Sequence, residues 1–134
     1  MYLIEPEVSG QLGDRVIMDT TIHPPVVSYL HFVFYGWMGD DIIECFPVFL
    51  VTERLKNAIE SSKLSGCFIG DCEIEKSYEF VTLQPTVILP KFYWLRITGS
   101  QQDDFFIFQN KLGVSESALN VLREFNLNFA DVTN

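Results

Sequence analysis

The chain contains an internal repeat, and this repeat restricts the fold more than any other feature of the sequence. Residues 51–59, VTERLKNAI, align without a gap on residues 114–122, VSESALNVL. Each segment has a hydroxyl side chain where a helix can begin, a glutamate in the first turn, and apolar residues at helical spacing. Each segment therefore predicts a capped amphipathic helix. The expected buried stripes are Leu55, Ala58 and Ile59 in the first helix and Ala118, Val121 and Leu122 in the second.

The similarity extends beyond the two helices. It reaches Ile69 in the first copy and Val132 in the second, where each helix gives way to a strand. We interpret residues 46–70 and 105–133 as two strand–helix–strand units, and we expect both helices to bury their stripes against the same sheet. The alternative is a chance similarity between two capped helices.

Other segments have the pattern of strands. Residues 30–35 alternate between two faces, and residues 92–98 and 104–109 are rich in aromatic and β-branched residues. No linker rich in Pro, Gly or Ser divides the chain, so we expect a single domain over residues 1–134. The sequence thus predicts an α+β fold, with a mainly antiparallel sheet and two amphipathic helices from the two units.

Composition indicates a folded protein. Hydrophobic residues make up 48% of the chain and charged residues 20%, unlike a disordered sequence. No apolar run approaches the roughly 20 residues of a membrane-spanning helix, and the first residues lack the basic region of a secretory signal, so we expect a cytoplasmic protein. Cys45, Cys67 and Cys72 follow no spacing typical of a zinc site or a disulfide framework, which predicts reduced, partly buried thiols.

The charge of the chain favours a basic partner. The net charge is −9, and Arg15 is the only basic residue in the acidic first 50 residues. Such a field repels nucleic-acid phosphates and anionic membranes but accelerates encounter with a basic protein. We therefore expect neither nucleic acid nor membrane as a partner. The alternative is that the acidity only keeps the protein soluble.

The segment GWMGDDIIECFP, residues 36–47, carries the densest group of candidate functional side chains. Adjacent carboxylates can belong to a metal site, a catalytic pair or a recognition surface. His23 and His31 are the only histidines, too few for a recognisable metal centre. The chain also has no nucleophile elbow and no phosphate-binding glycine loop. We therefore expect no catalytic residue, metal or cofactor, and interpret the chain as a binding protein.

The same segment resembles a known protein family. The string GWMGDDIIECFP followed by FLVTE at residues 49–53 is similar to a motif in small bacterial proteins that are grouped with the immunity proteins of polymorphic toxin systems. FYWLRITG at residues 92–99 and VSESAL at residues 114–119 are similar too. The resemblance also includes the opening EPE and the HPP turn, so it covers nearly the whole chain.

This resemblance implies a protein that binds a cognate toxin domain and occludes its active site or substrate groove. Toxins that act on nucleic acids have basic clefts, which would suit an acidic loop carrying Asp40, Asp41 and Glu44 beside the aromatic anchor Trp37. These four residues are the predicted partner-binding site. The alternatives are that Trp37 packs in the core and that the aspartates form a solvated turn.

Two other functional classes remain open from the sequence. One is an uncharacterised enzyme that uses Asp41, Glu44 and His31 as acid and base groups. The other is a structural or assembly subunit that associates through aromatic surface. The sequence does not name the toxin or the oligomeric state.

Overall fold

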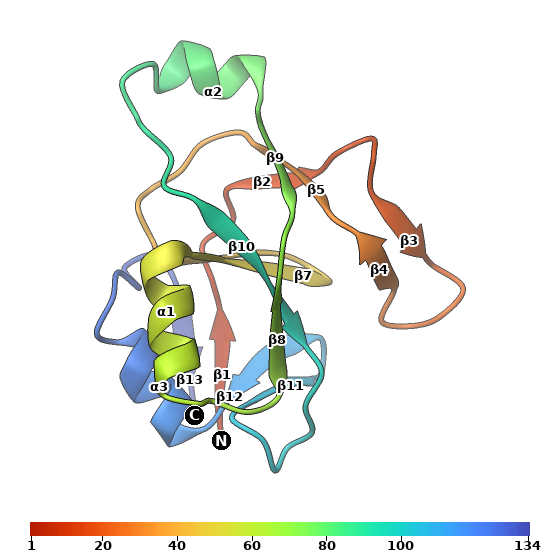
Figure 1. Ribbon diagram of the computed structural model, residues 1–134, viewed down its shortest axis with the longest axis vertical. Coiled ribbons are helices and arrows are strands. Elements are labelled where there is room, and N and C mark those ends of the chain that lie inside the picture. The colour runs from red at the N-terminus through yellow and green to blue at the C-terminus, as the bar shows by residue number, and fades with distance from the viewer.

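The computed structural model describes residues 1–134 as an α+β fold of mostly antiparallel strands, as predicted (Figure 1). The strands are β1 (Tyr2–Glu5), β2 (Gly10–Leu12), β3 (Ile17–Asp19), β4 (Val26–Tyr29), β5 (His31–Phe34), β6 (Ile42–Cys45), β7 (Val48–Thr52), β8 (Cys67–Gly70), β9 (Glu73–Lys76), β10 (Phe92–Ile97), β11 (Phe105–Phe108), β12 (Lys111–Val114) and β13 (Asp131–Thr133). The helices are α1 (Glu53–Ser61), α2 (Tyr78–Leu83) and α3 (Glu116–Leu122). α1 and α3 are the two predicted helices, and no helix is long and apolar enough to cross a bilayer.

The first repeated unit is a hairpin followed by a helix and a strand. β6 pairs with β7, α1 follows, and β8 lies two places away from β7 in the sheet order β6-β7-β10-β8. β10, which comes later in the chain, lies antiparallel between β7 and β8. β7 and β8 are therefore parallel to each other, separated by one strand from outside the unit.

The second unit has the same topology, in the sheet order β11-β12-β1-β13. Here β1 occupies the place of β10, between the hairpin and the strand that follows α3. The registers also correspond. Ile42 lies opposite Val51 in the first hairpin, and Phe105 lies opposite Val114 in the second. The first unit extends from β6 to β8 and the second from β11 to β13. The first begins at Ile42, four residues before the predicted boundary at residue 46, and the second begins at Phe105, as predicted.

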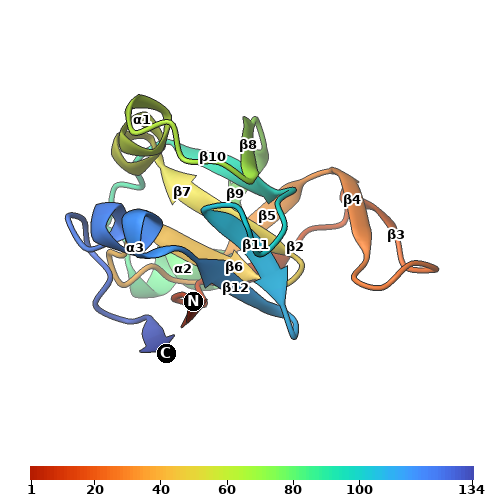
Figure 2. The same ribbon diagram turned by 90° about the horizontal axis from the view of Figure 1, so that it is seen from below.

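Both units bury their inner faces in one common core, beside which α1 and α3 lie next to each other (Figures 1 and 2). Most members of this core come in corresponding pairs, one from each unit or its inserted strand. The pairs are Ile42 and Phe105, Phe49 and Leu112, Val51 and Val114, Leu55 and Ala118, Ile59 and Leu122, and Leu95 and Ile4. The repeat is therefore a property of the packing as well as of the sequence.

The two helices share this core but not one sheet, which corrects the sequence-based expectation. α1 contacts β7 and β10, whereas α3 contacts β12 in the other sheet. Each helix lies beside the sheet of its own unit because α1 directly follows β7 and a single residue separates β12 from α3. Ala58 and Val121 are only partly buried, whereas Leu119 is fully buried.

A second core covers the outer face of the first unit only. All five residues of β7 are buried, with Phe49 and Val51 in the common core and Val48 and Leu50 in the second core. Phe32 and Phe34 of β5 and Phe80 of α2 complete this second layer. The layer includes the one parallel ladder between named strands, β5 with β9, and the β2 strand at its edge.

α2 is a third helix that the sequence analysis does not predict, because six residues are too short for a clear helical period. Ser77 begins it: its Oγ accepts a hydrogen bond from the Phe80 amide at 3.0 Å. Phe80 is its only buried residue. The β3–β4 hairpin, in contrast, projects away from the rest of the molecule (Figures 1 and 2).

Candidate functional site

Asp41 is the best-connected carboxylate in the predicted site. Its oxygens accept hydrogen bonds from Arg54 Nε at 2.7 Å, Arg54 Nη2 at 2.6 Å and Thr52 Oγ1 at 2.5 Å. They also accept one from the Asn126 amide at 2.8 Å, far along the chain. Burial acts to raise the pKa of Asp41, but the bonds from Arg54, Thr52 and Asn126 outweigh it and hold that pKa below its ordinary value. Asp41 therefore joins the first hairpin, the start of α1 and the turn after α3.

Asp40 and Glu7 hold the neighbouring segments in the same way. Asp40 accepts hydrogen bonds from the amides of Asn128 at 2.9 Å and Phe129 at 2.7 Å. Glu7 accepts from the amides of Met38 at 2.8 Å and Asp40 at 3.1 Å. Asp40 thus holds the turn after α3 and Glu7 holds the loop after β5, each through two backbone N–H groups.

The second unit has the counterpart of Asp41. Asp104 accepts a hydrogen bond from Ser115 Oγ at 2.6 Å, as Asp41 does from Thr52. It also accepts one from the Ser65 amide at 2.9 Å, in the turn that follows α1. Asp41 therefore binds the turn after the other unit's helix, and Asp104 does the same in return. We call this pair of contacts the reciprocal clamp.

The hydrogen bonds of Asp40 and Asp41 correct the role predicted for these two adjacent residues. Asp40 is 0% exposed and Asp41 is 2% exposed, so neither presents its charge to a partner. They form neither the acidic recognition loop nor the solvated turn considered from the sequence. The physical reason is that each carboxylate is surrounded by N–H and O–H donors from other segments. Thr52 also differs from expectation, since its hydroxyl donates to Asp41 and makes no helix-capping bond.

Trp37 lies at the surface end of this network and is half-buried. Its ring packs edge-on against Phe92, with 5.7 Å between the ring centres. Its Nε1 donates to the Asp40 carbonyl at 2.9 Å, and its backbone exchanges two hydrogen bonds with the Gln84 side chain. Trp37 is thus fixed in orientation by the core and still borders two surface pockets.

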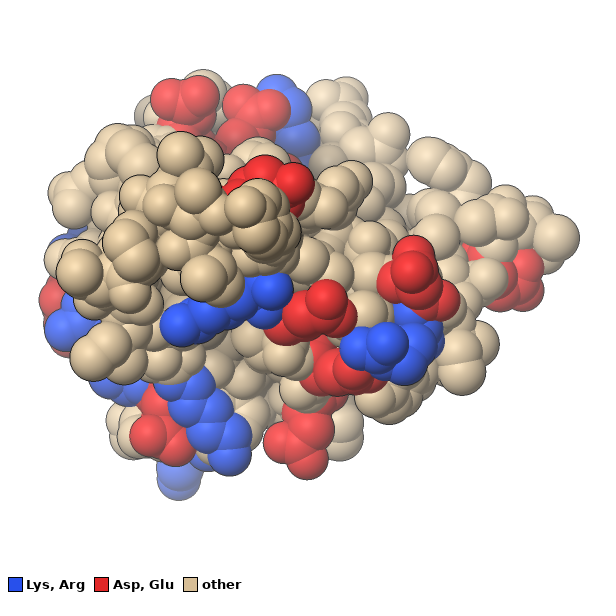
Figure 3. All heavy atoms as spheres, turned by 90° about the horizontal axis from the view of Figure 1, so that it is seen from above, with Lys and Arg blue, Asp and Glu red and all other residues tan.

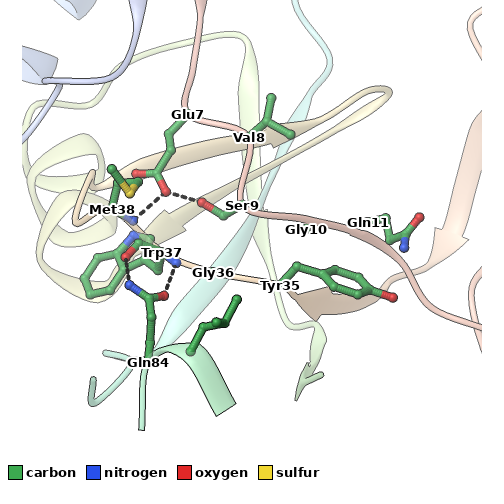
Figure 4. Close-up of a pocket in the computed structure, with 11 residues that line it drawn as sticks. Glu7, Val8, Ser9, Gly10, Gln11, Tyr35, Gly36, Trp37, Met38 and Gln84 are labelled. Carbon is green, nitrogen blue, oxygen red and sulfur yellow. Dashed lines mark hydrogen bonds between the residues drawn. The ribbon is translucent and has the colours of Figure 1, made fainter. Parts of the chain in front are cut away.

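The first of these pockets lies between Trp37 and the C-terminal end of α2 and has a volume of about 540 Å³. Figure 4 shows Glu7 and Ser9 on one side, with Trp37 and Gln84 on the other. Val8, Met38 and Leu83 border it and are 72%, 60% and 76% exposed. The second pocket, of about 520 Å³, has Ile88 on its border, 87% exposed. We call Trp37 and these four exposed residues the Trp37 patch.

The Trp37 patch lies next to an uncharged area of the surface. Figure 3, which views the molecule from the α2 side, shows a wide uncharged area with acidic and basic side chains around its edges. Tyr78 and Val81 of α2 are exposed there in addition to Leu83. Contiguous exposed apolar side chains on a protein surface mark interaction sites.

Glu44, the remaining predicted site residue, lies apart from the clamp on β6. Its carboxyl group is partly buried, and burial together with the nearby charge of Glu5 raises its pKa to about 7. The register explains this environment. Glu44 lies opposite Phe49 as Ile107 lies opposite Leu112, and Ile107 packs against the common core. Glu44 therefore places a carboxylate at a position that is apolar in the other unit.

The two histidines occupy different environments. His31 is 2% exposed, accepts a hydrogen bond from the Arg15 amide at 3.1 Å through Nδ1, and lies 2.9 Å from Glu75 Oε1 through Nε2. His23 is exposed and lies 3.2 Å from Asn110 Oδ1. The structure shows no group of three or more His, Cys, Asp or Glu residues that could hold a metal ion.

The structure does not bring together the three residues of the enzyme alternative. Asp41 borders the pocket beside Arg54, whereas His31 borders a separate polar pocket beside Glu75. Glu44 borders neither. The three cysteines are free and partly buried, as predicted, and burial raises the pKa of Cys67 to about 11 and of Cys72 to about 12.

Sequence reasoning missed the residues that complete the Trp37 patch. Val8, Leu83 and Ile88 lie in segments for which no element was expected. Ser77 followed by an acidic residue in the next turn is a helix-start signal that would have located α2. Comparison with protein-family models, with curated proteins and with solved structures finds no match to this chain.

Proposed function

We propose that this protein is an immunity protein, which binds a cognate bacterial toxin domain and neutralises it by occluding its active site or substrate groove. The resemblance of residues 36–53 to immunity proteins of polymorphic toxin systems supports the choice of partner. The net charge of −9 supports a partner with a basic surface. The proposed function is a cytoplasmic one, since the protein protects the cell that makes it.

The observation that carries this proposal is the Trp37 patch. Four apolar side chains, each more than half exposed, border the two pockets that Trp37 also borders, and the core fixes the orientation of the Trp37 ring. A preoriented aromatic side chain loses little conformational freedom on binding, and aromatic anchors at the centre of an interface contribute most of its affinity. Trp37 therefore keeps its proposed role as an anchor, even though part of its ring packs in the core.

Glu44 keeps a proposed role in binding a basic partner. A carboxylate at a position that favours an apolar residue lowers stability when it is ionised. The structure offers Glu44 no hydrogen-bond donor or cationic side chain to offset this cost. A cation on the toxin would supply the missing charge partner. Asp40 and Asp41 have no such role, because their oxygens already accept hydrogen bonds from the amides of Asn126, Asn128 and Phe129.

Co-expression tests the proposal directly. The chain is produced together with the product of the gene immediately upstream, and survival and copurification are measured. We expect survival and a stable complex. The double variant Met38→Asp with Leu83→Asp should abolish both. The double variant Ile17→Asp with Ile22→Asp, which places the same two charges on exposed apolar positions of the β3–β4 hairpin, should abolish neither.

Two outcomes would contradict the proposal. A chain that forms a stable homo-oligomer and protects against no toxin would favour the structural or assembly subunit. Turnover of a small substrate that depends on Asp41, Glu44 or His31 in a folded variant would favour the enzyme.

A further inference from the structure

Two adjoining surface pockets lie along one side of α2, the first of them beside Trp37. The pocket of about 540 Å³ beside Trp37 shares two residues, Gln11 and Tyr35, with a polar pocket of about 480 Å³. Figure 4 shows Gln11 and Tyr35 directed away from the Trp37 end. Because Gln11 and Tyr35 line both pockets, the pockets adjoin each other, and we treat them as the two halves of one groove.

The secondary structure explains the course of this groove. β2 and the C-terminal end of β5 line one side, while the first and last residues of α2 line the other. Phe32 and Phe34 of β5 point into the second core, so the alternate residues Val33 and Tyr35 face the groove. The groove is therefore built on a rigid strand and a helix anchored by Phe80.

The two halves differ in chemistry. Val8, Met38 and Leu83 make the half beside Trp37 apolar. The other half has a net acidic border, with Asp14, Glu75 and Glu79 against one cation, Arg15. Asp14 and Glu79 form no ion pair in the structure, because the nearby Arg15 is engaged by Glu73 and Glu75. Two exposed carboxylates thus remain without a cationic partner.

We infer that this groove binds an extended segment of the partner protein in which a lysine or arginine lies a few residues from an apolar side chain. The apolar side chain would lie against Trp37 and Leu83, and the cation would lie between Asp14 and Glu79. Charge complementarity selects this occupant, since an acidic half with two unpaired carboxylates disfavours an anionic or purely apolar segment. The inference rests on the proposed function for the identity of the partner.

Short peptides test the groove without the toxin. The ¹⁵N-labelled chain is titrated with a panel of peptides in which arginine and leucine are separated by increasing numbers of residues. The same panel is made with citrulline, a neutral analogue of arginine. We expect at least one spacing to shift the amide signals of Gln11, Tyr35 and Leu83 together, and its citrulline form to bind about tenfold more weakly.

A matched pair of variants distinguishes the effect of the carboxylates in the groove from the effect of the net charge of the protein. Asp14→Asn with Glu79→Gln should weaken the arginine peptide by about tenfold and leave the citrulline peptide unchanged. Glu124→Gln with Asp131→Asn removes the same charge from exposed positions outside the groove and should change neither. Equal binding of both peptides by all variants, or no binding at any spacing, would overturn the inference.

The toxin assay then distinguishes the two proposals. If the Asp14 and Glu79 variant protects cells as well as the wild type and binds no peptide, the groove inference is wrong and the immunity function stands. If peptides bind in the groove but no toxin is neutralised, the groove inference stands and the immunity function is wrong. Concentration-dependent self-association that Leu83→Asp abolishes would identify a second copy as the occupant and overturn the inference.

Discussion

The two repeated units are alike on the inside and different on the outside. Their inner faces contribute corresponding residues to one core, and their buried aspartates form the reciprocal clamp. Their outer faces share no such correspondence. Leu50 of β7 packs into the second core, whereas Gly113 at the same register position of β12 is covered by the ring of Phe106 from its own sheet.

This difference divides the molecule into a framework, made of the two inner faces, and a layer that only the first unit carries. The inner faces must remain complementary because each unit completes the core of the other. The outer face of the first unit carries an extra layer, made by β5, β9 and α2, and the Trp37 patch and the groove belong to that layer. The second unit has no equivalent layer. Apart from Glu44 on β6, the framework and the proposed recognition surface are therefore separate parts of the molecule.

The largest expected effect comes from breaking the clamp. Asp41→Ala removes the acceptor of four hydrogen bonds, two of them from Arg54, which is itself 59% exposed. The loss of these charge-assisted bonds, with the buried Thr52 hydroxyl left unpaired, should lower the free energy of unfolding by about 3 to 4 kcal/mol. Asp104→Ala should cost only about 1 to 2 kcal/mol, because no cation pairs with Asp104. Denaturant unfolding measures both. Equal costs would mean that the two halves of the clamp contribute equally, in spite of Arg54.

The next effect compares the two outer faces. Leu50→Ala leaves a cavity beneath the added layer and should destabilise the protein by about 3 kcal/mol. Gly113→Ala should cost about 1 to 2 kcal/mol, because its Cβ would lie 2.1 Å from a ring carbon of Phe106 and the ring would have to move. Thermal melting measures both values. A Leu50→Ala variant as stable as the wild type would show that the second layer contributes little to folding.

A third effect depends on pH and concerns Glu44. Its pKa is raised to about 7 in the folded protein, so the stabilisation that comes from its protonated form is complete below its unfolded pKa of 4.5. That stabilisation is lost as the pH rises through about 7. Glu44→Gln should therefore gain about 1 to 2 kcal/mol of stability relative to the wild type at about pH 8, and less at about pH 5. Solvent screening limits this gain in stability, since Glu44 is only partly buried.

The Glu44 measurement consists of urea unfolding across that pH range. Ile107→Val in the second unit is the control, since it changes a corresponding side chain and introduces no titrating group. A pH-independent difference between Glu44→Gln and the wild type would contradict the raised pKa. If Glu44→Gln is more stable but binds the toxin more weakly, then the carboxylate of Glu44 lowers the stability of the protein and strengthens its binding to the toxin.

The smallest effect separates the two residues that begin the paired helices. Ser115 both caps α3, through a bond from the Ala118 amide, and donates to Asp104. Thr52 donates only to Asp41. Ser115→Ala should therefore cost about 1 to 2 kcal/mol and Thr52→Ala about 1 kcal/mol, both by chemical denaturation. The reverse order would mean that the Thr52–Asp41 bond contributes more than a helix cap.

Much of the framework could be predicted from the sequence because it depends on local patterns. Capping residues and apolar spacing located α1 and α3 within two residues, alternation located β5, and aromatic and β-branched content located β10 and β11. The arrangement of the sheets could not be predicted in this way, because β1 and β10 are inserted from distant parts of the chain and local patterns do not record their neighbours.

The role of the adjacent aspartates could not be predicted from local pattern alone. Asp and Gly together are typical of an exposed turn, and only the distant amides of Asn126 and Asn128 make the turn a buried one. One signal was present in the sequence. Extending the repeat backwards aligns Asp40 and Asp41 with a second pair, Asp103 and Asp104, at the start of the other hairpin. A repeated acidic pair favours a structural role over contact with a partner.

Hydrogen–deuterium exchange of the chain with and without its toxin tests most directly the claim that recognition belongs to the added layer. Our account predicts slower exchange on toxin binding in residues 8–12, 33–38 and 78–84, which line the groove and the Trp37 patch. It predicts unchanged exchange in the second unit, residues 105–133. Protection confined to the second unit, with none beside Trp37, would contradict the account.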